Sequence, residues 1–368
     1  MRQGTIEAFF ALLRSGLWEQ GVRLSAYEPI DYAALFRLAQ EQSVVGLVAA
    51  GLEHVEDVKV GKLDALPFFQ EVVSLEARNG AMDAFVEELT GKLHAAGIRP
   101  LLVKGQGIAQ CYERPMWRTS GDVDLLLDAG DYGRAKGLLA AMASSVDVEG
   151  AATLHFGMEL NGWTVELHGT MRGGLSPRIN RVMDQVQGTV CSGACVRSWQ
   201  NGGTEVLLPG PDADVVYVFV HFLNHFYKGG VCLRQVCDWA RLLWTCRAEV
   251  DAGLLERRLR KIHLLSEWRA FGAFAVGHLG LPADALPLYD PAGKWARKAE
   301  RIRAFVLEYG SERDTGYYGK YPYLVRKAIS LRLRLGDLCR HARLFPLDSL
   351  RFLPYVLFTG LRSAVRGE

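Results

Sequence analysis

The 368-residue sequence contains no run of about 18 uncharged apolar residues, the length that a membrane-spanning helix requires. It also has no internal repeat and no low-complexity linker. Lys and Arg number 43 and Asp and Glu number 41, so no overall charge excess indicates a nucleic acid or another strongly charged partner. The first residues, up to Arg14, have the pattern of an amphipathic helix and lack a cleavage pattern, and we therefore expect a cytoplasmic protein.

Cysteine is scarce and irregularly spaced. The seven cysteines are an odd number in a large chain, which favours reduced thiols over a disulfide framework. Two pairs, Cys191 with Cys195 and Cys232 with Cys237, are candidate zinc half-sites, but neither has the CxxC spacing. We interpret them as structural thiols.

The periodicity of apolar residues divides the chain into three regions. It is helical over residues 5–95 and again from Pro211 onward, whereas short alternating runs typical of strands lie between. We therefore predict an α+β fold. The expected divisions are an N-terminal helical region (1–96), a core with a small mixed β-sheet (97–210) and a C-terminal helical domain with a basic tail (211–368).

The central region carries the strand signals on which the functional argument depends. One strand is closed by Gly105, and two others are joined by Asn161-Gly162, a strong hairpin signal. A second hairpin is predicted around Asn201-Gly202. The predicted strands that carry polar residues of interest are residues 98–104, 122–127, 154–160 and 163–168.

Two aspartates, Asp122 and Asp124, sit one residue apart in the strand W-R-T-S-G-D-V-D-L-L-L-D. Side chains alternate along a strand, so both carboxylates are expected on one side of it. They repel each other unless a cation lies between them, and the usual cation is a metal. The alternative is a structural pair that caps a turn and a strand end.

Glu166 lies on the opposite face of its strand from Val165 and Leu167. If the hairpin pairs beside the aspartate strand, Glu166 joins Asp122 and Asp124. Three carboxylates on one face suit a pair of Mg²⁺ (or Mn²⁺) ions, and a two-metal site points to nucleotidyl transfer. A glutamate on a solvated hairpin face would have the same pattern.

Four residues near this strand are candidate nucleotide ligands. Lys104 and Gly105 end a strand where a helix begins, a place that favours phosphate. Arg118 precedes Asp122 by four residues, and its guanidinium is suited to holding a phosphate. Gly121, directly before the aspartate strand, is included with them. For Lys104 the alternative is a strand-end lysine that reaches water.

Further polar residues are candidates for an acceptor cleft. His221 and His225 have the i, i+4 spacing of a helical metal chelate, although core or interface histidines are the favoured interpretation. Arg234 and Asp238 have the spacing of a helical ion pair and are expected on the cleft wall. His168 lies on the same face as Glu166, where it is placed to orient a carboxylate or touch the acceptor.

The stretch from Tyr321 to Arg366 is basic, with nine Lys or Arg against two Asp. A solvated helix face is the default interpretation of this tail. A surface that contacts a membrane or RNA is the alternative.

At these residues the sequence resembles the uncharacterised bacterial nucleotidyltransferases of the DNA polymerase beta superfamily. The resemblance rests on L101-L-V-K-G, R118-T-S-G-D-V-D-L-L-L and V165-E-L-H, and it continues into H221-F-L-N-H and L233-R-Q-V-C-D-W-A-R-L-L. It also includes Tyr112, L344-F-P and I30-D-Y-A-A-L-F-R-L-A-Q, and so covers most of the chain.

The resemblance implies a nucleotidyltransferase core, Mg²⁺ dependence and an NTP donor. Asp122 and Asp124 would bind the metal, and Glu166 would assist them and act as the base toward an acceptor hydroxyl. Lys104-Gly105 stands where many superfamily members carry Gly-Ser or Gly-Gly. The chain departs from the superfamily pattern here, at a position that would contact the triphosphate.

Two rival functions remain at this stage. One is a catalytically inactive nucleotide-binding or protein-interaction module with the same fold. The other is a metal hydrolase built on His221 and His225, for which imidazole ligands favour Zn²⁺. The acceptor of a transferase is left open as a small molecule, a protein or RNA.

Overall fold

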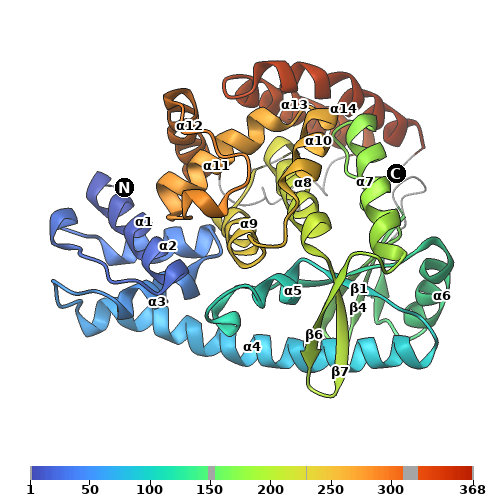
Figure 1. Ribbon diagram of the computed structural model, residues 1–368, viewed down its shortest axis with the longest axis horizontal. Helices are drawn as coiled ribbons and strands as arrows, with labels where there is room; N and C mark the ends of the chain where they lie inside the picture. Colours follow the sequence, from blue (N-terminus) through green and yellow to red (C-terminus); the bar gives the residue numbers. More distant parts are fainter. Residues whose placement is uncertain (1, 148–153, 229, 310–321, 367–368) are drawn as a thin grey trace.

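The computed structural model describes residues 2–147, 154–228, 230–309 and 322–366 (Figure 1). Its strands are β1 (Leu101–Val103), β2 (Asp122–Leu126), β3 (Ser145–Val146), β4 (His155–Leu160), β5 (Trp163–His168), β6 (Val196–Asn201) and β7 (Thr204–Pro209). Its α-helices are α1 (Gln3–Trp18), α2 (Tyr32–Glu41), α3 (Val45–Glu53), α4 (Lys62–Ala95), α5 (Gly105–Ala109), α6 (Ala129–Ala140), α7 (Pro177–Cys191), α8 (Pro211–Lys228), α9 (Leu233–Thr245), α10 (Ala252–Ile262), α11 (Leu265–Leu279), α12 (Gly293–Tyr309), α13 (Tyr323–Ala342) and α14 (Pro346–Arg366). Short 3-10 segments are η1 (Ser25–Tyr27), η2 (Pro115–Trp117) and η3 (Ala283–Ala285).

The strands form one seven-stranded mixed sheet in the order β3-β4-β5-β2-β1-β7-β6. β2 is parallel to β5 and β1 is parallel to β7, whereas the other neighbours are antiparallel. Both predicted hairpins are present. Asn161 and Gly162 join β4 to β5 with φ angles of +51° and +80°, as a two-residue turn of this kind requires. The predicted α+β class, with a mixed sheet between helical regions, is confirmed.

The two faces of the sheet have different partners. Val123 and Leu125 of β2 and Val165 and Leu167 of β5 are buried in a core that they share with α4 and α6. In Figure 1 the long helix α4 crosses one side of the sheet, and α8 and α9 lie on the other. Because strand side chains alternate, the polar residues of β2 and β5 face the side of α8.

The N-terminal and C-terminal helices pack against each other. The rings of Phe10 in α1 and Phe274 in α11 are 6.5 Å apart, and the indole nitrogen of Trp18 donates to the carbonyl of Leu279 at 2.6 Å. One hydrophobic core therefore includes helices from both ends of the chain. The predicted divisions after residues 96 and 210 fall between secondary-structure elements, and they stay a prediction as domain boundaries.

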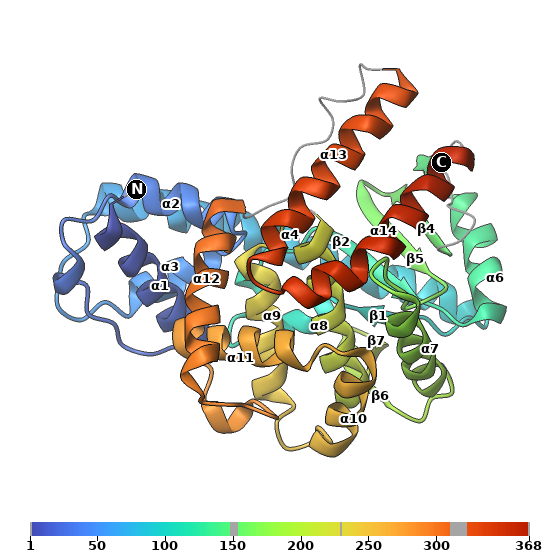
Figure 2. The ribbon, with the colours of Figure 1, turned by 90° about the horizontal axis from the view of Figure 1, so that it is seen from above.

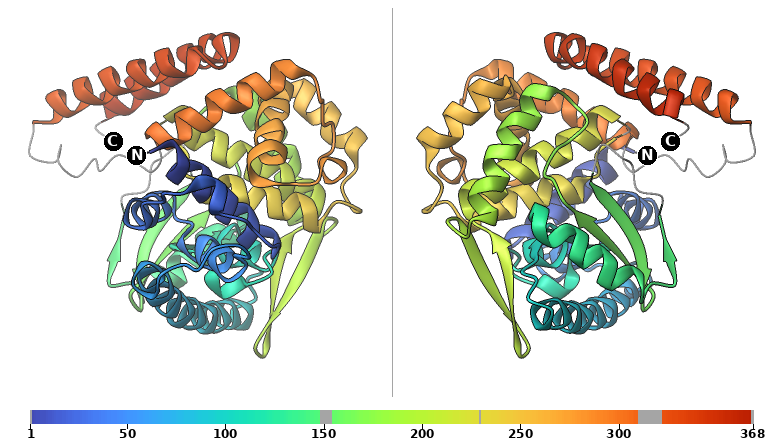
Figure 3. Two further views of the ribbon diagram at one scale, coloured as in Figure 1. Left: turned by 90° about the vertical axis from the view of Figure 1, so that its left-hand side faces the viewer. Right: turned by 90° about the vertical axis from the view of Figure 1, so that its right-hand side faces the viewer.

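The basic tail forms two helices, α13 and α14, which lie as a hairpin on the outside of the molecule (Figures 2 and 3). Part of the predicted tail, residue 321, lies outside the described residues. Among the described residues, none of the helices combines the length and apolar character that a membrane crossing requires. All seven cysteines are free thiols, as predicted.

Candidate active site

The three predicted carboxylates converge on one face of the sheet. β2 and β5 pair in parallel with Asp124 opposite Glu166, and Asp122 is on the same side of β2 as Asp124. Carboxylate oxygens of Asp122, Asp124 and Glu166 all lie within 4.8 Å of one another. Burial, and then repulsion from Asp124, raise the pKa of Asp122 above its ordinary value. The cluster therefore carries negative charge that a cation would stabilise.

Lys104 already supplies one cation to this cluster. It stands at the end of β1, and its ammonium nitrogen lies 2.7 Å from Oδ1 of Asp124. Burial opposes the charge of Lys104, but the attraction and hydrogen bond of Asp124, together with Tyr217 and Asp122, outweigh it, so the pKa of the ammonium is raised. Lys104 has a φ of +60° and Gly105 a φ of +42°. A positive φ is uncommon for a lysine, and the turn that holds it delivers its side chain to the carboxylates.

Two histidines hold the carboxylates from the β5 side. His168 Nε2 lies 2.6 Å from Oδ1 of Asp124 and 3.4 Å from Oε2 of Glu166. His155 Nε2, from β4, lies 2.9 Å from the same Glu166 oxygen. Hydrogen bonds from His155, and then from His168, hold the pKa of Glu166 well below its usual range. Burial disfavours a charged His168, yet its hydrogen bonds to Asp124 and Glu166 outweigh burial and raise its pKa.

His155 was not predicted from the sequence, although a signal for it is present. In the β4–β5 hairpin it pairs directly with His168. The turn at Asn161-Gly162 fixes this register, because pairs count outward from a two-residue loop. The same counting applied to the sequence would have placed His155 beside the carboxylates.

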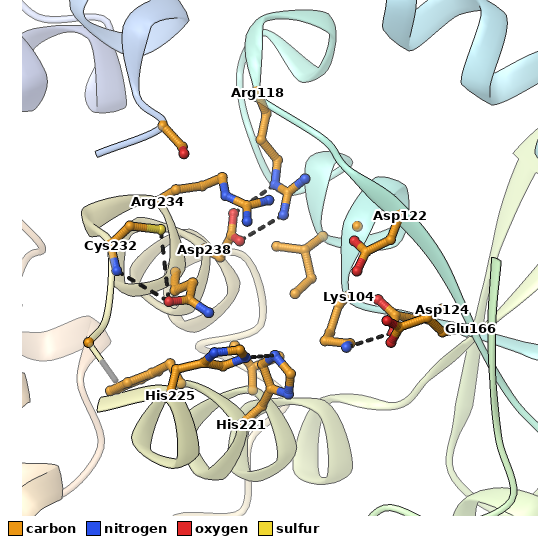
Figure 4. A pocket seen from close by; sticks show the side chains of 17 residues that line it. Lys104, Arg118, Asp122, Asp124, Glu166, His221, His225, Cys232, Arg234 and Asp238 are labelled. Carbon is orange, nitrogen blue, oxygen red and sulfur yellow. Dashed lines mark hydrogen bonds and ion pairs between the residues drawn. The ribbon is translucent and has the colours of Figure 1, made fainter. Parts of the chain in front are cut away.

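A cavity of about 520 Å³ opens beside the carboxylates (Figure 4). Its walls come from the end of β1, from β2 and β5, from α8 and α9, and from Ser43 in the loop between α2 and α3. This volume is in the range of small-molecule sites, about 300–1,000 Å³. Ser43 was missed by the sequence argument, since nothing local indicates that the N-terminal region reaches the cavity.

Arg118 lines the cavity, but its guanidinium is bound by a carboxylate of α9. Its Nε and Nη2 donate to the two carboxylate oxygens of Asp238, each at 2.7 Å, and its side chain is buried. The Tyr112 hydroxyl donates to Asp238 at 2.7 Å. Burial disfavours both charges, but each partner outweighs it, so the pKa of Arg118 is raised and that of Asp238 is lowered. The Arg118–Asp238 pair therefore holds the segment that precedes β2 against α9.

The predicted pairing of Arg234 with Asp238 is wrong. Asp238 is bound by Arg118, and Arg234 Nη1 instead donates to the carbonyl of Thr119 at 3.1 Å. Arg234 lines the cavity, and its Nε atom is buried with no hydrogen-bond partner. An unpaired buried donor of a guanidinium is costly, and an anionic ligand would satisfy it.

His221 and His225 line the opposite wall, on α8. Their Nε2 atoms are 3.1 Å apart, and burial, followed by the nearby Lys104 cation, lowers the pKa of His221 well below its ordinary value. Within the described part of the chain they belong to no group of three metal-ligating side chains. The pair alone therefore gives little support to a zinc site.

Two predicted residues lie aside from the cavity. Gly121 is exposed and precedes β2 without lining the cavity, and His168 reaches the carboxylates from behind them. The remaining predicted site residues line it: Lys104, Gly105, Arg118, Asp122, Asp124, Glu166, His221, His225, Arg234 and Asp238.

A family model described as an uncharacterised nucleotidyltransferase matches residues 28–276. The chain belongs to this nucleotidyltransferase family. A search of the curated proteins gives no match.

The match to the nucleotidyltransferase family includes the whole sheet and all of the candidate site residues. It ends within α11, before α13 and α14. Membership indicates a transferase that uses an NTP, and the acidic group is able to hold a metal ion. The family description names neither the donor base nor the acceptor.

Proposed function

We propose that this protein transfers a nucleoside monophosphate from an NTP to a hydroxyl group of an acceptor and releases pyrophosphate. The observation that carries the proposal is the convergence of Asp122, Asp124 and Glu166 at the wall of the cavity. A chain in the nucleotidyltransferase family with this cluster has the ligands that the reaction needs.

The donor set fits Mg²⁺ or Mn²⁺. All three candidate ligands are carboxylates, the hard oxygen donors that these ions prefer, and the raised pKa of Asp122, due first to burial, favours added positive charge. Bound there, divalent ions supply charge to the triphosphate and lower the pKa of the acceptor hydroxyl.

The cations of the cavity wall are proposed to bind the triphosphate. Lys104 is within reach of both the carboxylates and the cavity, and Arg234 has a buried Nε without a partner. Arg118 is assigned a positioning role instead, because Asp238 occupies its guanidinium. Gly105 allows the backbone to turn tightly beside Asp122.

In the proposed step the acceptor oxygen forms a bond to the α-phosphorus. The bond from that phosphorus to the bridging oxygen breaks, and pyrophosphate leaves with the electron pair. We assign Glu166 a ligand role, because a carboxylate whose pKa is held low by His155 and His168 is a weak base. The hydroxyl proton then passes to water.

The acceptor is proposed to enter between the sheet and α8 and α9, where His221 and His225 stand. A small molecule, a protein side chain or an RNA end would each supply the acceptor hydroxyl.

Calorimetric titration with ATP, GTP, CTP and UTP, with and without Mg²⁺, tests the proposal. Wild type should bind at least one NTP only with the metal, and the double variant Asp122→Asn/Asp124→Asn should lose this binding. The matched control is Asp184→Asn, an exposed carboxylate paired with Arg172 outside the cavity. Unchanged NTP binding in the double variant would show that the two aspartates are not metal ligands. If wild type bound none of the four NTPs, the protein-interaction module would be favoured.

A further inference from the structure

The α13–α14 hairpin has one face that packs against the molecule. The ring of Phe352 lies 4.9 Å from that of Tyr227 in α8, and Phe345 lies 6.2 Å from Phe226. Asp348 lies on this side of α14 and is buried as well. The inner face therefore accounts for how the hairpin is held to the protein.

The opposite side of α14 carries large apolar residues that packing does not explain. Leu347, Leu350 and Phe358 expose 64%, 66% and 60% of their surface, and Leu357 is also exposed. At 100° per residue these four positions fall on one stripe of the helix, away from Phe345 and Phe352. We call this stripe the outer ridge. A contiguous exposed apolar stripe of this kind indicates an interaction surface.

The neighbouring helix extends this apolar surface. Val325, Leu331 and Leu335 of α13 are exposed. At 100° per residue Val325 and Leu335 lie about 80° apart around the helix, whereas Leu331 projects beside the buried Leu338. Both helices of the hairpin thus have an apolar inner side and a partly apolar outer side.

The exposed charges of the hairpin have one sign. Arg332 and Arg343 are exposed. The two aspartates of residues 322–366 are Asp337 and Asp348, and both are buried and bound to arginines, at 2.6 Å and 2.9 Å. Among the described side chains of the hairpin, the exposed charges are therefore cations, without exposed carboxylates.

We propose that the outer face of the α13–α14 hairpin binds the surface of an anionic lipid bilayer. A helix with aliphatic residues on its outer stripe and arginines beside it lies in the interface, with the apolar stripe among the acyl chains and the arginines at the headgroups. The inference is independent of the proposed reaction, because the hairpin lies outside the family match and contributes nothing to the cavity.

Two other occupants fit the surface less well. A second copy of the chain would bring the same excess of cations against Arg332 and Arg343, which repel. An RNA-binding surface is more polar and offers aromatic rings for stacking, whereas the outer ridge has three leucines and one phenylalanine.

Cosedimentation of the full chain with vesicles tests the inference. Wild type should bind vesicles that contain phosphatidylglycerol and bind vesicles of phosphatidylcholine alone much more weakly. Leu347→Glu/Leu350→Glu should weaken binding by at least about ten-fold, because two leucines leave the acyl region. The matched control is Leu63→Glu, a leucine of α4 that is 85% exposed and outside the hairpin.

A charge variant separates the two parts of the surface. Arg332→Glu/Arg343→Glu should weaken binding to the anionic vesicles by more than ten-fold, since each arginine near such a surface contributes about five-fold. Its control is Arg23→Glu, whose side chain is 78% exposed in another part of the chain. Circular dichroism and thermal unfolding confirm that each variant is folded.

Several results would overturn the inference. In the first, wild type does not bind anionic vesicles. In the second, Leu347→Glu/Leu350→Glu binds them as tightly as wild type. In the third, wild type binds neutral vesicles as tightly as anionic ones. Self-association in sedimentation that disappears in the leucine variant, without vesicle binding, would assign the outer ridge to a second copy. Binding of RNA in place of vesicles, lost in the arginine variant, would assign it to nucleic acid.

Discussion

The ammonium group of Lys104 lies 2.7 Å from Oδ1 of Asp124, one of the three clustered carboxylates. A lysine in this position neutralises part of the charge that a metal ion would neutralise. Its backbone, with φ at +60° and ψ at −148°, is in an uncommon conformation for a residue with a side chain. We infer that Lys104 and a metal ion compete for Asp124. When the metal ion and the NTP are both bound, the Lys104 ammonium would leave Asp124 and contact the triphosphate.

Replacement of Lys104 by methionine should therefore strengthen metal binding in the absence of nucleotide. A charge-assisted hydrogen bond contributes about 1.5–3 kcal/mol, so its removal should lower the Kd for Mn²⁺ by about ten-fold or more. The KM for the NTP should rise, because a phosphate ligand is lost. Electron paramagnetic resonance of free Mn²⁺ measures the affinity, and Lys92→Met, in an exposed ion pair of α4, is the control. Weaker Mn²⁺ binding in Lys104→Met would contradict the competition.

The Arg118–Asp238 pair should be a large contributor to stability. Asp238→Ala leaves a buried guanidinium without its partner, and breaking such a pair costs about 3–5 kcal/mol. Urea unfolding measures the loss. Asp184→Ala, which breaks an exposed pair with Arg172, should cost no more than about 1 kcal/mol. Equal losses in the two variants would show that the buried pair has no special weight.

His155 should support metal binding through Glu166. It donates to Oε2 of Glu166 at 2.9 Å, and loss of such a partner of a metal ligand typically costs about 10–100-fold in affinity. We expect His155→Ala to weaken Mg²⁺-dependent NTP binding by about this amount. His155→Gln keeps an N–H donor and should recover part of it, whereas equal losses in both variants would exclude the hydrogen bond as the cause.

Glu267 should give the folding stability a pH dependence far from the active site. Burial, and then the Asp348 carboxylate, raise the pKa of Glu267 to about 8, and the Tyr227 hydroxyl lies 3.0 Å from it. In the unfolded chain a glutamate has a pKa of about 4.3. Between these pKa values the folded state holds a proton that the unfolded state has lost, so stability falls as pH rises.

The expected slope is about 1.4 kcal/mol per pH unit between roughly pH 5 and pH 8, and it levels off above this window. Glu267→Gln removes the titrating group and should flatten the curve, and it should be more stable than wild type at pH 8. Urea unfolding at several pH values measures it, with the exposed Glu256→Gln as control. A slope unchanged in Glu267→Gln would assign the pH dependence to other groups.

Local patterns in the sequence were sufficient to predict both hairpins of the sheet and the shared side of Asp122 and Asp124, whereas the pairing of β2 with β5, which brings Glu166 to them, joins distant segments and was only a condition of the prediction. Alternation along β2 places Asp122 and Asp124 together, and the turn at Asn161-Gly162 defines the hairpin that carries Glu166. These features depend on residues close in sequence, whose periodicity and turn chemistry are visible without the fold.

Contacts between distant segments were not predictable in the same way. Arg118 binds Asp238, 120 positions away, and Ser43 reaches the cavity from the N-terminal helices. Helix spacing favoured Arg234 as the partner of Asp238. In the structure α9 packs beside the segment that precedes β2, and Asp238 is bound by Arg118 of that segment. Tertiary packing thus decided which arginine stays available to a ligand.

The central claim is that the carboxylate cluster catalyses nucleotidyl transfer, and the fate of a labelled phosphate tests it most directly. The chain is incubated with Mg²⁺, a cell extract as the source of acceptor, and the NTP that binds, labelled at either the α- or the γ-phosphate. We predict that the α-label enters an acceptor and the γ-label appears in pyrophosphate, and that Asp122→Asn/Asp124→Asn abolishes both. Transfer of the γ-label to an acceptor, α-label transfer by the double variant, or no transfer by a wild type that binds the NTP would contradict the claim.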